Sequence, residues 1–220
     1  MPTEITVRGR SSASEPPERG TVHATIAFEG PAMEPVYERV ARDVDNVRRS
    51  VESLRAADGP VTRWSAQDLR TWSSRPWNQD GKRLPVVYHA RVDIEVEFRD
   101  FTALSRWITA HTNDTEGVRI SDVEWSLSTR RDDELRRQVR TEAVEDAVRR
   151  AQQYADALHL GEVRPVAVAD SGMLSAVPSP GGGHDVGLMR SMAVGSAPEI
   201  ELVPEDIEVS ATVDARFVAG

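Results

Sequence analysis

The sequence predicts an α+β fold in which three helices pack on antiparallel sheet layers, and two observations lead to it. Several stretches alternate apolar and polar residues, as half-buried strands do, and the clearest lies within residues 84–99. Three others, at about 34–57, 101–112 and 132–160, repeat apolar residues every three or four positions, as amphipathic helices do. Strands with one polar face are typical of antiparallel sheets, so we expect the helices to cover one sheet face.

The N-terminal part predicts two strands followed by a helix. Ile5-Thr6-Val7 alternates, and residues 10–20, rich in Ser, Glu and Pro, predict a loose connection. Residues 21–29 predict a half-buried strand. The helix at 34–57 is lined by valines, whose β-branched side chains lower helix propensity, so packing against a sheet must hold it.

The middle of the chain predicts a long hairpin, a second helix and another strand. Residues 61–72 and 84–99 form the two arms, and the turn-rich stretch 73–83 joins them. After the helix at 101–112, residues 118–128 alternate out of phase on either side of Ser121-Asp122. This change of phase predicts a β-bulge there.

The helix at 132–160 is the longest helical pattern in the chain. Asp132 or Asp133 is its expected N-cap, and Gly161 is the expected left-handed residue after its end. Its apolar stripe is narrow and consists mostly of small side chains: Leu135, Val139, Ala143, Ala147, Ala151, Ala155 and Leu158. Small side chains allow a close approach to a neighbouring strand or helix.

The C-terminal part predicts two strands on either side of a mobile loop. Val163, Val166 and Val168 indicate the first strand, and strict alternation over 207–217 indicates the last. The loop, residues 171–198, is rich in Gly, Pro and Ser. We expect a single domain over residues 1–220.

Composition limits the possible partners and locations. The net charge is −9, and acidic residues are interleaved with the arginines, which argues against nucleic-acid binding. The chain has no cysteine, which excludes disulfides and thiolate chemistry. It contains no run of eighteen apolar residues and does not start with a signal-peptide pattern, so we expect no membrane insertion and a cytoplasmic location.

Chemistry-bearing residues do not form a recognisable catalytic or metal motif. The five histidines lack metal-ligand spacing, and His23 and His89 fit the polar faces of strands. Asp93, Glu95 and Glu97 share a strand face with Arg91 and Arg99, as on the solvated side of a sheet. No nucleophile elbow is present. We therefore expect no catalytic residue, no cofactor and no metal site.

Three stretches together resemble the SIMPL domain family of bacterial proteins. They are residues 5–9 (ITVRG), residues 143–161 with their spaced alanines, and residues 204–213 (PEDIEVSATV). The chain departs from the family where Glu205 stands in place of a frequent Gly, and in lacking the signal peptide of exported members. The resemblance implies an α+β fold, ring-like or channel-like homo-oligomers and a link to stress defence, with no agreed enzymatic activity.

Three functional hypotheses follow. The first is a non-enzymatic, homo-oligomeric scaffold with contacts at the hairpin tip, through Trp72, Arg75, Trp77 and Asn78. The second is a binding module in which Met173, Met189 and Met192 of the 171–198 loop contact a small apolar ligand or a protein. The third is a hydrolase that uses Asp93 and Glu95 with a histidine.

Overall fold

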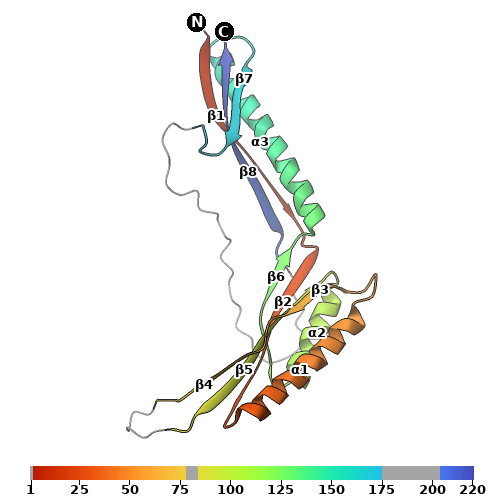
Figure 1. Cartoon of the computed structure of the whole chain (residues 1–220). Helices are drawn as coiled ribbons and strands as arrows, with labels where there is room; N and C mark the ends of the chain where they lie inside the picture. The colour runs from red at the N-terminus through yellow and green to blue at the C-terminus, as the bar shows by residue number, and fades with distance from the viewer. Residues whose placement is uncertain (1, 78–83, 175–203) are drawn as a thin grey trace. The chain divides into compact units, whose positions relative to one another are not determined.

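The computed structural model describes residues 2–77, 84–174 and 204–220, and within them it confirms the α+β class with three helices and two antiparallel sheets (Figure 1). The elements in chain order are β1 (Thr3–Glu15), β2 (Arg19–Gly30), α1 (Met33–Leu54), β3 (Val61–Ala66), β4 (Arg70–Ser74), β5 (Val87–Phe98), α2 (Phe101–Asp114), β6 (Val118–Ser126), α3 (Thr129–Ala157), β7 (Arg164–Asp170) and β8 (Ile207–Ala219).

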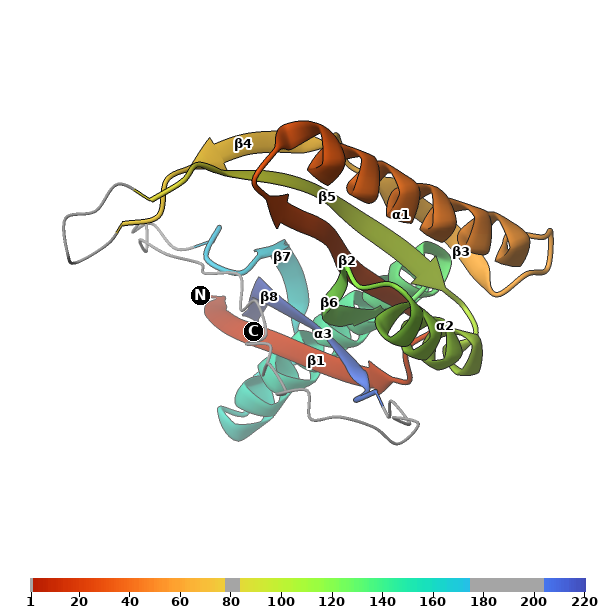
Figure 2. The same ribbon diagram turned by 90° about the horizontal axis from the view of Figure 1, so that it is seen from below.

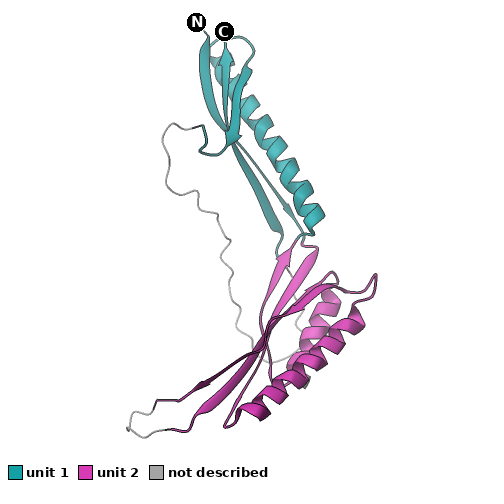
Figure 3. Ribbon diagram, viewed as in Figure 1, with its two compact units in different colours: residues 1–16, 127–190, 205–220 teal, residues 17–126, 191–204 magenta. Residues whose placement is uncertain are grey.

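The chain divides into two compact units, each with its own sheet and core (Figure 3). Unit 1 contains residues 1–16, 127–190 and 205–220, and unit 2 contains residues 17–126 and 191–204. That the two units act as a single domain, as the sequence suggests, stays a prediction.

Unit 2 is a sheet of strand order β3-β5-β2-β6 with α1 and α2 on one face (Figure 1). β4 pairs with the first half of β5, and β3 pairs with the second half. The predicted valine stripe of α1 is buried against the sheet, at Val36, Val40, Val47 and Val51. Burial against the sheet supplies the stabilisation that β-branched residues do not give a helix by themselves.

The predicted bulge in β6 is confirmed. In the pairing of β2 with β6, His23 lies opposite Asp122 and the next residue, Ala24, lies opposite Ile120. Ser121 is therefore the extra residue, and the register shifts at this point. Such an insertion twists the strand locally and changes the direction of the side chains beside it.

Unit 1 is a three-stranded sheet, β1-β8-β7, packed against α3. The predicted stripe of α3 is buried from Leu135 to Ala155. The alanines bring the helix very close to β1: a Cβ atom added to Gly9 would lie 2.0 Å from the carbonyl oxygen of Ala143 and 2.8 Å from the Cβ of Ala147. Residues 5–9 and 143–161, two of the stretches that resemble the SIMPL family, thus pack against each other.

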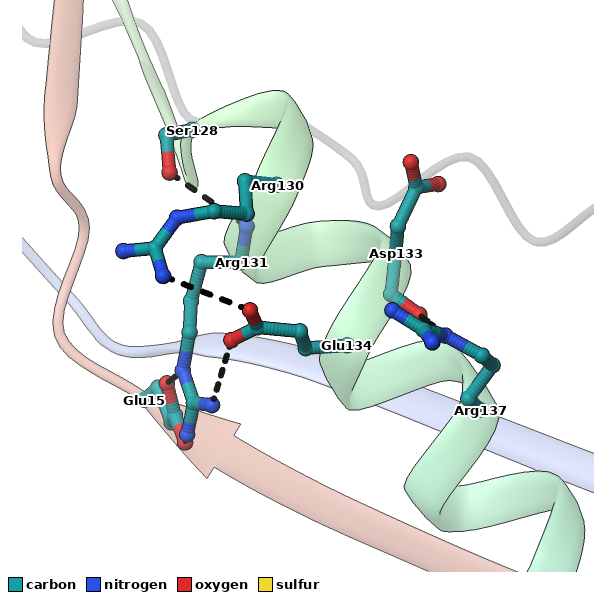
Figure 4. A network of polar contacts seen from close by, with 7 residues as sticks. All are labelled: Glu15, Ser128, Arg130, Arg131, Asp133, Glu134 and Arg137. Atoms are coloured by element: carbon teal, nitrogen blue, oxygen red, sulfur yellow. Dashed lines mark hydrogen bonds and ion pairs between the residues drawn. The ribbon is translucent and has the colours of Figure 1, made fainter.

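The start of α3 differs from the prediction. Its N-cap is Ser128, whose hydroxyl accepts a hydrogen bond from the backbone N–H of Arg131, so neither Asp132 nor Asp133 is the cap. The Arg131 guanidinium pairs with Glu15 of β1 and with Glu134, which fastens the helix start to the end of the strand (Figure 4). Hydrogen bonds from Arg131 to both carboxylates raise its pKa above the usual value.

The end of α3 also differs. The helix stops at Ala157, and the left-handed residue is His159, with φ 58°, and not Gly161. Leu158, expected in the buried stripe, is 60% exposed because it follows the last helical turn. The N–H of Leu160 bonds to the carbonyl of Ala155, which closes the helix one turn before the glycine.

Two strand boundaries correct the sequence-based expectations. β1 continues to Glu15, so residues 10–15 are not a loose connection. Residues 61–72 are not one strand, because β3 ends at Ala66 and β4 begins only at Arg70; between them, the Gln67 N–H donates to the Asp93 carbonyl. None of the helices in the described ranges is long and apolar enough to cross a membrane.

Candidate functional site

The sheet face of unit 2 opposite α1 and α2, which we call the open face, is polar. On β5 the alternation buries Ala90 to Phe98 against the helices and turns the intervening residues outward. In the described parts of unit 2, both helices pack on the other side. The outward residues of β5 are His89, Arg91, Asp93, Glu95 and Glu97. The open face therefore presents a row of ionisable side chains.

A shallow hollow of about 260 Å³ lies on the open face at the β6 bulge. It is lined by His23, Ala24, Thr25, Gln67, Arg91, Asp93, Ile94, Glu95, Ser121 and Asp122. These residues come from β2, β5 and β6 and from the connection after β3, so the register of three strands is needed to bring them together.

Asp93 is fixed as an anion on one side of the hollow. Its Oδ1 accepts hydrogen bonds from the Thr25 hydroxyl at 2.8 Å and from Arg91 Nε at 2.8 Å. Burial opposes ionisation, but these bonds and the positive charges of Arg91 and Arg70 together hold the pKa of Asp93 below its usual value. The two bonds direct the Asp93 carboxylate toward Thr25 and Arg91, and the hydrolase hypothesis at this residue stays a prediction.

His23 lies between two carboxylates on the other side of the hollow. Its Nδ1 is 3.7 Å from Glu95 of β5, and its Nε2 is 3.4 Å from Glu124 of β6. Both ring nitrogens face carboxylates, so the imidazole is not placed to activate a hydroxyl.

The negative charge of the hollow is unbalanced at this end. Within the described chain, the ion pairs of Glu95 and Glu124 involve His23 and no arginine or lysine. Glu97, by contrast, has Arg19 at 3.9 Å and Arg63 at 3.7 Å. Glu95 and Glu124 therefore have no arginine or lysine partner among the described residues. A third acidic residue, Asp122, lines the hollow beside His23.

A second cluster lies where β4 pairs with the beginning of β5. The Trp72 ring stacks on His89 with centroids 5.0 Å apart and an interplanar angle of 9°. His89 also bonds to the Ser74 hydroxyl at 2.8 Å and lies 3.4 Å from Glu29 of β2. The stack fixes the Trp72 ring while leaving 46% of the residue exposed.

We call β4, residues 75–77 and the beginning of β5 the arm. All five residues of β4 are exposed, and Figures 1 and 2 show this part of the sheet extending beyond the start of α1. Trp77 is 88% exposed and Arg75 is exposed beside it. Trp72, Arg75 and Trp77 are thus accessible in the described chain, and Asn78 lies outside the described residues.

The loop hypothesis remains a prediction. Met173 is 75% exposed, whereas Met189 and Met192 lie outside the described residues. Just before Met173, the backbone N–H of Gly172 donates to the Asp214 carboxylate at 2.6 Å.

Asp214 is a buried anion on β8 of unit 1. The Arg8 guanidinium lies 2.7 Å from it, and the bonds from Arg8 and Gly172 keep its pKa below the usual value even though burial acts in the opposite direction. The arrangement ties β1, β8 and the turn after β7 together, which is a structural role.

The sequence located the polar face, the bulge and the exposed tryptophans, but not the pairing of His23 with Glu95 and Glu124. That pairing depends on strand register, and the three residues are far apart in the chain. Among the described side chains, no group of three or more His, Asp or Glu residues is arranged to hold a metal ion.

These features define an α+β protein with two units, each made of a sheet and at least one helix. In the described residues, the polar clusters are ion pairs and hydrogen bonds between side chains on the sheets. The SIMPL family model, whose description is protein of unknown function (DUF541), matches residues 5–217 of the 220-residue chain. The chain therefore belongs to the SIMPL family, which confirms the resemblance seen in the sequence. No curated protein matches the chain.

Proposed function

We propose that this protein is a non-enzymatic, self-assembling scaffold whose subunits contact one another through the arm. The observation that carries the proposal is the exposure of Trp72 and Trp77 on an extension of the sheet, 46% and 88% respectively. Large exposed apolar residues that lie close together mark interaction sites, and tryptophan is enriched among the residues that dominate binding energy.

The fixed position of the Trp72 ring in the arm supports the proposed subunit contact. Trp72 is already stacked on His89, and His89 is bonded to Ser74, so the indole is held before any partner arrives. A side chain that is fixed in advance loses less entropy on binding. The link to stress defence is carried over from the family resemblance and rests on it alone.

Sedimentation equilibrium of the full chain tests the proposal. The wild type is expected to sediment as a discrete oligomer, and the Trp72→Ala/Trp77→Ala variant as a smaller species. Tyr154→Ala is the matched control, because Tyr154 is an exposed aromatic residue on α3 of unit 1, away from the arm in sequence. A wild type that stays monomeric at high protein concentration and low salt contradicts the proposal.

A further inference from the structure

We propose that the arm of one copy docks on the open face of the next, with the Arg75 guanidinium against the exposed carboxylates of Glu95 and Glu124 that flank His23. This inference rests on the proposed self-assembly and adds the surface that receives the arm. It is argued from the charge of the open face, the chemistry of the arm and the distance between them.

The open face supplies an anionic acceptor. Glu95 and Glu124 flank His23, and both carboxylates are partly exposed, with side-chain exposures of 42% and 54%. Arg91 is committed to Asp93, and Arg19 and Arg63 lie beside Glu97. These three arginines therefore lie beside other carboxylates, and Arg119 of β6, exposed opposite Thr25, forms no ion pair with Glu95 or Glu124 in the described chain. The negative charge beside His23 is thus available to an incoming cation.

The arm supplies a cation of matching chemistry. Arg75 takes part in none of the ion pairs or hydrogen bonds within the described residues, and it is separated from the exposed Trp77 only by Pro76. A guanidinium is planar and more weakly hydrated than an ammonium, and it donates parallel hydrogen bonds to carboxylates. The adjacent indole adds apolar contact area to the same docking event.

Arg75 cannot reach Glu95 of its own chain. Ser74 pairs with Val87, near the outer end of β5, whereas Glu95 lies eight residues farther along the same strand. At ~3.4 Å per residue this separation is about 27 Å, several times the length of an arginine side chain. A contact between Arg75 and Glu95 must therefore join two copies.

Such a contact is heterologous, because the arm of one copy meets a different surface on the next. Each copy keeps one arm and one open face, so contacts of this kind close into a ring or continue as a filament. Because the arm and the open face are different surfaces, a variant with a defective arm and a variant with a defective face can restore association when they are mixed. A contact in which each surface meets its own copy does not give this result.

Charge reversal with complementation tests the inference. Arg75→Glu has a defective arm and an intact face, and Glu95→Lys/Glu124→Lys has an intact arm and a defective face. Each variant alone is expected to associate at least about 30-fold more weakly than wild type, since each leaves a charge unpaired in the contact. An equimolar mixture is expected to assemble as wild type does, because the intact arm meets the intact face and the charge-reversed arm meets the charge-reversed face. A chain carrying all three substitutions is expected to assemble for the same reason.

Glu38→Lys is the matched control, because it makes the same kind of charge change on an exposed residue of α1, on the other side of the sheet. Far-UV circular dichroism checks that every variant is folded. An oligomer that Trp72→Ala/Trp77→Ala dissociates but the charge variants leave intact overturns this inference and preserves the proposed function. A monomeric wild type removes both. Variants that dissociate alone but show no complex on mixing also overturn the inference.

Discussion

Gly9→Ala is expected to destabilise unit 1 strongly, although it adds a single methyl group. β1 passes over the alanine stripe of α3 so closely that the new Cβ would lie 2.0 Å from the Ala143 carbonyl oxygen and 2.7 Å from the Ala147 nitrogen. Both are backbone atoms, so no side chain can rotate out of the way. Strand and helix must move apart along a contact that the buried alanines otherwise fill.

The magnitude follows from two opposing effects. Overpacking a core costs about 1–3 kcal/mol and occasionally more, and a clash with backbone atoms belongs at the upper end. Replacing glycine by alanine also restricts the unfolded chain, which returns about 0.4–1 kcal/mol. The net loss is about 2 kcal/mol or more, a fall in Tm of roughly 4–8 °C for a chain of this size.

Thermal and urea unfolding followed by two probes measure this loss. Far-UV circular dichroism reports on the helices of both units, including α3, the longest helix of the described chain, which lies in unit 1. Fluorescence reports on unit 2, because all the tryptophans lie there, at Trp64, Trp72, Trp77, Trp107 and Trp125. We expect Gly9→Ala to lower the transition seen by circular dichroism more than the one seen by fluorescence.

Gly161→Ala is the control. No atom lies within 4 Å of a Cβ built at Gly161, and its backbone is outside the left-handed region, so a methyl group is tolerated there. If Gly9→Ala unfolds within about 0.5 kcal/mol of this control, the range usual for surface substitutions, the close approach of β1 to α3 is refuted.

Three further predictions concern stability. Ser128→Ala should cost about 1 kcal/mol in urea unfolding because it removes the cap of α3, and Asp133→Ala should cost clearly less. Asp214→Asn should lower the Tm of unit 1 at neutral pH, because the ionised Asp214 carboxylate stabilises the fold. Its lowered pKa means that this stabilisation is present above about pH 3.8 and is lost on further acidification. The Tm of the variant should therefore fall less than the wild-type Tm below that pH. Leu104→Ala, at a fully buried site, should cost about 2–5 kcal/mol and shift the fluorescence transition.

The full length of β1 could not be predicted from the alternation of apolar and polar residues. The strand continues past Val7 with Gly9, Ser11 and Ala13 turned to the same side as Ile5 and Val7. Gly9 is small because it meets Ala143 and Ala147 of α3, whereas Ser11 bonds to Glu142 and Ala13 packs beside Leu135 and Val139. The alternation of large apolar residues therefore stops although the strand does not. The valine helix α1, by contrast, packs on larger side chains and its pattern is plain.

The candidate surface was predictable in part. Alternation identified the polar side of β5, and a change of phase identified the bulge at Ser121. The hollow also requires that β2 lie between β5 and β6 with His23 opposite both Glu95 and Asp122. Pairing partners and register come from tertiary packing, which local sequence patterns do not encode.

The family resemblance and the proposed function rest on different units. Residues 5–9 and 143–161 lie in unit 1, as do residues 205–213, and they form its strand-and-helix core. The arm and the hollow lie in unit 2. Substitutions at the Gly9 contact should therefore change stability while leaving association intact at temperatures where the protein is folded. Substitutions at Arg75 or Glu124 should do the reverse, so the two properties can be separated by mutation within one chain.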